Sequence, residues 1–138
     1  MSVNGQDFYD FALKCVAQGD EISLRNAVGR AYYGVYHDVC EKLQKCPQPP
    51  THHGVSDYLI ETAWLTGYEP YDKMKLISLG TMLKSLHVQR KWADYNLEAD
   101  YTKTDAEATL IMAKKGMEKS KAMYEEKFPS TPAPAPAA

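Results

Sequence analysis

The chain has 138 residues, of which 44% are hydrophobic and 25% are charged, and its formal net charge is -2. This length and apolar fraction suit one domain, or one domain with a tail, whose core needs neither metal nor disulfides to hold it. The near-neutral charge excludes a nucleic-acid binder that relies on a cationic field over the whole chain, so any such contact needs a local basic patch.

The cysteines and the N-terminal segment indicate the environment of the protein. The chain has three cysteines, Cys15, Cys40 and Cys46, and they form no Cys-x-x-Cys pair. This pattern is typical of reduced thiols in a cytoplasmic protein. The first residues lack the basic and apolar pattern of a signal peptide, and no window approaches the roughly 18 apolar residues of a membrane helix. We therefore expect a soluble cytoplasmic protein without a membrane contact.

Apolar residues recur at helical spacing along most of the chain. The first helix is predicted over about 7–18, with Asn4 as its N-cap and Gly19 as its stop. The second helix is predicted over about 23–45, and it ends before a proline-rich segment because proline cannot continue a helix.

The second half of the chain continues the same pattern. A third helix is expected from His52 to a stop at Gly67, and a fourth over about 71–91, with Met74, Ile77, Met82, Leu83 and Leu86 as its core contacts. The last helix enters through a capping box, Thr104 to Glu107. Since no segment alternates like a strand, the fold class predicted is all-α, an antiparallel bundle of about five helices.

The last ten residues differ in composition from the rest of the chain. Residues 1–128 are predicted to form the helical domain. Residues 129–138 read PSTPAPAPAA, which offers nothing to bury, so a disordered Pro/Ala tail is expected there.

The second predicted helix carries two contrasting faces. At about 100° per residue its core stripe consists of Val28, Tyr32, Val35, Val39 and Leu43. The opposite stripe contains Ala27, Arg30, Gly34, His37 and Glu41. A glycine inside a helix suggests a close approach, so Ala27, Gly34 and Glu41 are predicted to contact a second copy of the chain. The alternative is an ordinary solvated face.

Three motifs follow one another along the sequence, and the first is Arg30-Ala-Tyr-Tyr-Gly-Val-Tyr-His37. It is similar to the R-A-Y-Y-x-x-F-H stretch of HEPN domains, a family whose signature is Arg, four to six residues, then His. Thr51-His-His-Gly-Val55 resembles its T-H-x-G-V stretch, and Arg90-Lys-Trp-Ala-Asp-Tyr95 its R-x-x-A-D-Y stretch. The likeness covers about residues 5–128 and implies the HEPN helical bundle.

For active members the resemblance implies metal-independent RNA cleavage in the cleft of a homodimer. His37 would then transfer protons and Arg30 would hold the scissile phosphate. Tyr33 lies nearest the Arg30 face among the neighbouring tyrosines and is a candidate for stacking on RNA. Arg90 and Lys91 are candidates for phosphate contacts, or alternatively for capping helix carbonyls.

Two departures from the active pattern keep a second hypothesis open. Ala31 stands where active members often carry a polar residue, and Val39 stands where one toxin branch has a tyrosine that a partner modifies. The chain is therefore either an endoribonuclease of a toxin or phage-defence system, or an inactive HEPN subunit. Its expected partners are a second copy, RNA, and a cognate antitoxin or nucleotidyltransferase.

No cofactor or metal is predicted. His52, His53 and Asp57 are too few for a structural metal site, which takes about four spaced ligands. Phosphate-binding glycine loops and catalytic Ser-His-Asp orders are also missing from the sequence.

Overall fold

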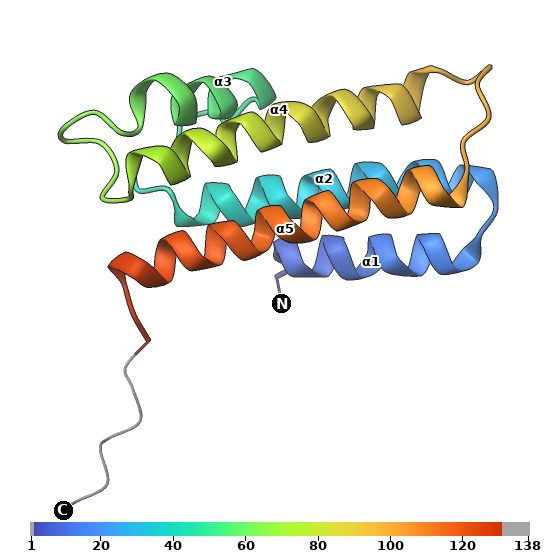
Figure 1. The fold of residues 1–138 in the computed structure, drawn as a ribbon, viewed down its shortest axis with the longest axis horizontal. Coiled ribbons are helices and arrows are strands. Elements are labelled where there is room, and N and C mark those ends of the chain that lie inside the picture. Colours follow the sequence, from blue (N-terminus) through green and yellow to red (C-terminus); the bar gives the residue numbers. More distant parts are fainter. Residues whose placement is uncertain (1, 131–138) are drawn as a thin grey trace, which may run out of the picture.

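In a computed structural model that describes residues 2–130, the chain folds as an all-helical bundle (Figure 1). The long helices are α1 (Gly5–Gln18), α2 (Glu21–Lys42), α4 (Lys73–Tyr95) and α5 (Lys103–Lys127). Each long helix runs antiparallel to the long helix that precedes it (Figure 1). Within residues 2–130 there are five α-helices and no strand, so the predicted fold class, an all-α helical bundle, is confirmed.

The remaining α-helix packs beside α4. Helix α3 (His52–Asp57) continues directly into a π-helical segment, η1 (Tyr58–Thr62), and both contact α4. Thr51 caps α3, because its hydroxyl oxygen accepts a hydrogen bond from the Gly54 amide at 3.0 Å. This arrangement places the histidines at the start of α3 next to the middle of α4.

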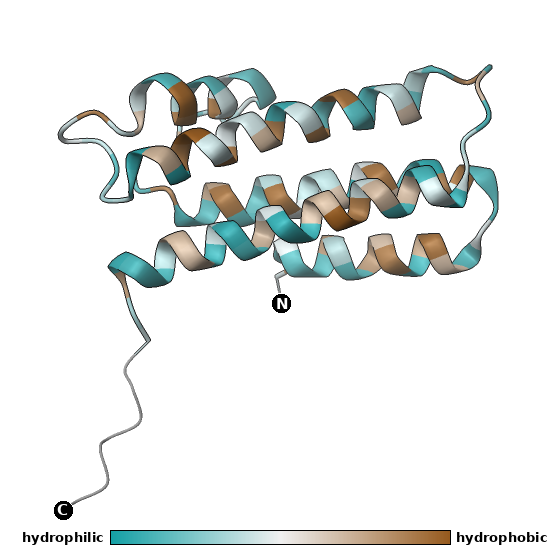
Figure 2. Ribbon diagram, in the orientation of Figure 1, coloured by the Kyte–Doolittle hydropathy of each residue, from teal (hydrophilic) through white to brown (hydrophobic). Residues whose placement is uncertain are grey.

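Helix α2 is the centre of the bundle, since it packs against α1, α4 and α5. Its predicted core stripe is buried as expected, at Val28, Tyr32, Val35, Val39 and Leu43. Figure 2 shows apolar bands that recur along the helices and are separated by hydrophilic residues. Burial of such stripes is the main source of stability for helices of this length.

Capping groups fix the ends of α1 as predicted. The Asn4 side chain accepts a hydrogen bond from the Asp7 amide, and the Asp7 carboxylate accepts one from the Asn4 amide. Helix α1 ends at Gln18, and its C-cap is Gly19, whose φ of 83° lies in the left-handed region that favours glycine.

Helix α2 ends three residues before its predicted end at residue 45. The backbone turns to an extended conformation at Leu43. The amides of Gln44 and Lys45 then donate to the two carboxylate oxygens of Glu69, each at 2.8 Å. The buried Glu69 therefore replaces the helix carbonyls as the hydrogen-bond partner of this segment.

Two further expectations are corrected. The capping box of α5 is formed by Thr102 and Asp105, not by Thr104 and Glu107. In α4, Met74 is exposed, and Ile77 and Met82 are only half-buried. The buried line of α4 runs instead through Leu76, Leu79, Leu83 and Leu86.

Two observations bear on the ends of the chain and on membranes. Most of the tail predicted at 129–138 lies outside the described residues, because the description stops at residue 130. Among the helices of residues 2–130, none is both long and apolar enough to cross a membrane.

Candidate functional site

Arg30 and His37 lie on one face of α2, on either side of Tyr33, at spacings of three and four residues. The guanidinium carbon of Arg30 is 5.4 Å from the centre of the Tyr33 ring and 5.7 Å from that of Phe8. The His37 ring stacks on Tyr33 at 5.9 Å and lies 5.0 Å from the Phe8 ring. Arg30 and His37 therefore contact the same two aromatic rings, one from α2 and one from α1.

The positive charge of Arg30 has no acidic partner within residues 2–130. Its Nε is buried and has no hydrogen-bond partner among those residues. The guanidinium faces aromatic rings, which attract a cation but accept few of its hydrogen bonds. Most donors of Arg30 thus remain available for an anion that approaches this face.

Tyr33 joins this face of α2 to α4. Its hydroxyl oxygen accepts a hydrogen bond from Nη1 of Arg90 at 2.8 Å, and the Arg90 guanidinium carbon lies 5.4 Å from the Tyr33 ring centre. The Nε of Arg90 lies 3.3 Å from a carboxylate oxygen of Asp94, without the geometry of a hydrogen bond. Tyr33 is therefore contacted by both Arg30 and Arg90, while the predicted Lys91 is exposed next to Arg90.

Histidines extend the cluster toward α3. The Tyr32 hydroxyl lies 2.7 Å from Nδ1 of His52. Burial raises the pKa of the Tyr32 hydroxyl far above its ordinary value, so this hydroxyl keeps its proton in its hydrogen bond with Nδ1. The other ring nitrogen of His52, Nε2, lies 3.5 Å from the Tyr33 hydroxyl oxygen, and the tautomer of His52 sets which group donates in each bond.

His87 on α4 is the next member of the cluster. Its ring lies 4.8 Å from that of His52 and stacks on that of His53 at 5.5 Å. Burial, together with the positive charges of His52, Arg90, His53 and Lys91, lowers the pKa of His87 to about 4. Burial, Arg90 and His53 also lower the pKa of His52. The α3–α4 side of the site therefore concentrates basic groups.

The prediction that Ala27, Gly34 and Glu41 contact a second chain is wrong for Ala27 and Gly34. Ala27 and Gly34 are buried inside the chain, because α1 lies directly over this side of α2. A Cβ at Gly34 would lie only 2.9 Å from the carbonyl oxygen of Gly5 and 3.2 Å from the amide nitrogen of Tyr9. The close approach at the glycine thus occurs within one chain, and only Glu41 of the three is exposed.

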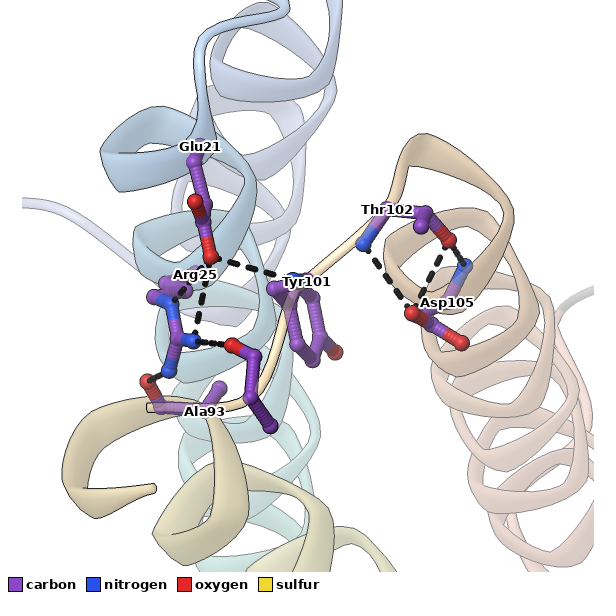
Figure 3. Close-up of polar contacts among 7 residues, drawn as sticks. Glu21, Arg25, Ala93, Tyr101, Thr102 and Asp105 are labelled. Atoms are coloured by element: carbon purple, nitrogen blue, oxygen red, sulfur yellow. Dashed lines mark hydrogen bonds and ion pairs between the residues drawn. The ribbon is translucent and has the colours of Figure 1, made fainter. Parts of the chain in front are cut away.

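Arg25 is a structural residue that the sequence patterns did not indicate. Its side chain is 6% exposed and donates to the carbonyl oxygens of Ala93 at 2.8 Å and Ala99 at 2.5 Å (Figure 3). A carboxylate oxygen of Glu21 accepts from Nη2 of Arg25 at 3.1 Å and from the Tyr101 amide at 3.0 Å. These bonds tie the end of α4 and the loop after it to the start of α2.

The hydrogen bonds of Arg25 position the C-terminal part of α4. Arg90 lies one helical turn before Ala93, so the hydrogen bond from Arg25 fixes the part of α4 that reaches Tyr33. The spacing of Glu21 and Arg25 is that of a helix pair, which was the only sequence signal. The carbonyls that Arg25 binds lie 68 and 74 residues further along the chain, beyond the reach of any local pattern.

In the described part of the chain, no group of three or more His, Cys, Asp or Glu side chains is placed to hold a metal ion. Comparison of the chain with protein-family models, curated proteins and solved structures finds no match. The resemblance to HEPN domains therefore stays a prediction that rests on the motif residues.

Proposed function

We propose that this chain is a HEPN-type endoribonuclease that cleaves RNA without a metal ion, as a homodimer in a toxin or phage-defence system. The observation that carries the proposal is the placement of Arg30 and His37 against the same two rings, with the charge of Arg30 unpaired within residues 2–130. An anion clamp and a proton-transfer group thus share one face of α2, on which His37 is exposed and Arg30 is half-buried.

The reaction uses the ribose itself as nucleophile. The 2′-oxygen bonds to phosphorus and gives up its proton to one imidazole, while the bond from phosphorus to the 5′-oxygen breaks and that oxygen receives a proton from a second imidazole. The guanidinium of Arg30 holds the phosphate and stabilises the charge that builds on it. A pair of chains supplies both imidazoles, one His37 from each.

A surface for pairing lies beside this site. Val3 and Phe11 are 72% and 45% exposed, and together with Phe8 and Asp7 they form a hollow that reaches Arg30. A second chain on the apolar part of this hollow would remove it from water and bring a second His37 toward the first. Glu41 is exposed one turn beyond His37 and stays within the proposed interface, whereas Ala27 and Gly34 do not.

A second candidate function is that of an inactive HEPN subunit that binds a partner nuclease, nucleotidyltransferase or antitoxin. The observation in its favour is the complete burial of Ala31, since active members often carry a polar residue at this position. Exposed Trp92 and Tyr95 at the end of α4 offer such a partner an aromatic surface.

Cleavage of RNA in excess chelator tests the proposal. The unchanged chain should cleave, His37→Ala should be slower by about 10²–10⁴-fold, and Arg30→Ala by about 10²–10³-fold. Lys121→Ala, an exposed change on α5, is the matched control and should cleave normally. Inactivity of the unchanged chain would support the subunit function instead.

A further inference from the structure

A second pocket lies beside the candidate site, between α3 and α4. Val88 and the buried Ser56 form part of its lining. The other lining side chains are all basic: His52, His53, Lys84, His87 and Lys91. Lys84, His87 and Lys91 are spaced by three and four residues, so they form one stripe along α4. The histidines of α3 face this stripe, because the rings of His52 and His53 both contact that of His87.

The charges around this pocket are unbalanced. Asp57 pairs with Lys84 at 2.9 Å, and Asp94 lies against Arg90. Every neighbouring group that shifts the pKa of His87 is basic and lowers it: His52, Arg90, His53 and Lys91. The lowered pKa values of His52 and His87 leave both imidazoles neutral near neutral pH, so the lysine of this pocket that no carboxylate pairs within residues 2–130 is Lys91. A positive charge beside neutral imidazole N–H donors disfavours a cation and favours an anion.

Side-chain contacts through Tyr33 connect the pocket with the Arg30–His37 face. Nε2 of His52 lies 3.5 Å from the Tyr33 hydroxyl oxygen, and that oxygen accepts the hydrogen bond of Arg90. Tyr33 in turn contacts both Arg30 and His37. A polyanion held at Arg30 therefore meets a second basic surface only one aromatic side chain away.

We propose that the pocket between α3 and α4 binds a backbone phosphate of RNA, from a nucleotide that neighbours the one held at Arg30. The inference rests on the proposed function, because it takes the ligand at Arg30 to be RNA. Lysines supply point charges to such a phosphate, and the histidines supply ring N–H donors. The pocket thereby lengthens the site from one phosphate to at least two.

Binding of a short single-stranded 2′-fluoro RNA tests the inference, because this RNA lacks the nucleophilic 2′-hydroxyl and cannot be cleaved by the proposed route. The test variant is Lys84→Ala/Lys91→Ala, and the matched control is Lys115→Ala/Lys121→Ala, two exposed lysines of α5. The test variant should bind about tenfold more weakly or worse. Its plot of log affinity against log salt should also flatten by about 0.7 for each phosphate that it no longer binds. Equal affinity and slope in the two variants would overturn the inference.

A second measurement uses the unchanged chain, so it does not depend on how a variant folds. The imidazole signals of His53 and His87 in NMR spectra should move when the 2′-fluoro RNA is added. Inorganic phosphate and AMP are the comparison ligands. If either moves these signals at concentrations well below that of the RNA, the ligand is a free phosphate, and the inference about RNA is wrong.

Cleavage of ordinary RNA, measured separately, distinguishes the two proposals. If the unchanged chain cleaves in a His37-dependent manner while the two double variants bind alike, the nuclease proposal stands and the second phosphate site is rejected. If the test variant alone loses binding and no chain cleaves, the phosphate site stands and the nuclease proposal is rejected. Absence of any RNA binding by the unchanged chain rejects both.

Discussion

The hydroxyl oxygen of Tyr33 accepts a hydrogen bond from Nη1 of Arg90 over 2.8 Å, and this bond connects the exposed face of α2 to α4. Through it, side-chain contacts connect the Arg30–His37 face with the histidine pocket between α3 and α4. Tyr33 therefore has two roles, since its ring separates Arg30 from His37 and its hydroxyl positions Arg90.

Replacement of Tyr33 by phenylalanine isolates the second role, because the ring stays and only the hydroxyl is removed. Arg90 then has no acceptor at this position, and we expect the free energy of unfolding to fall by about 1 kcal/mol in urea denaturation. Tyr95→Phe is the matched control, since the Tyr95 side chain is exposed. Equal stability of the two variants would contradict the role given to the hydroxyl.

Gly34→Ala tests the close packing of α1 on α2. The added Cβ would meet backbone atoms of Gly5 and Tyr9 at 2.9 and 3.2 Å, so the helices must move apart. We expect a decrease of about 1–3 kcal/mol in the free energy of unfolding. Gly29→Ala, in the same helix, meets only the Arg90 side chain at 3.8 Å and should gain about 0.5–1 kcal/mol. If the two variants were equally stable, the close packing at Gly34 would not matter.

Some of these features follow from the sequence pattern, and others depend on tertiary packing. The helical period alone places Arg30, Tyr33 and His37 on one face and the valines of α2 in the core. The glycine predicts a close approach at Gly34, but the segment that makes it is α1 and not the second chain that we expected, because a local pattern does not identify the packing partner. The bonds from Arg25 to Ala93 and Ala99, and the packing of His52 on His87, join helices far apart in the sequence, so only the tertiary structure reveals them.

Arg25→Met should weaken the attachment of α4 to α2. The carbonyl oxygens of Ala93 and Ala99 would be left without their donors, and we expect the free energy of unfolding to fall by about 2–3 kcal/mol. Arg25→Lys keeps the charge but cannot reach both carbonyls in a fork, so it should restore only part of this stability. Full recovery with lysine would show that the charge matters and the geometry does not.

The low pKa of His87 predicts a dependence of stability on pH. The folded state holds this imidazole neutral with a pKa of about 4, against an ordinary value of 6.5, because of burial and of His52, Arg90, His53 and Lys91. Between these values the unfolded state binds more protons, so the contribution of His87 is fully present above about pH 6.5 and is lost as the pH falls toward 4. His87→Gln should have a flatter stability profile over this range in thermal denaturation. Parallel profiles for the two proteins would contradict the assignment.

In the proposed reaction the ribose of the substrate is the nucleophile and His37 moves its proton. Mass spectrometry identifies the fragment ends after incubation of RNA with the purified chain in excess chelator. We expect 2′,3′-cyclic phosphate and 5′-hydroxyl ends, and no fragments from an RNA with deoxyribose at the cleaved position. Fragments with 3′-hydroxyl and 5′-phosphate ends, or the same cyclic ends at the same rate from a correctly folded His37→Ala chain, would contradict it.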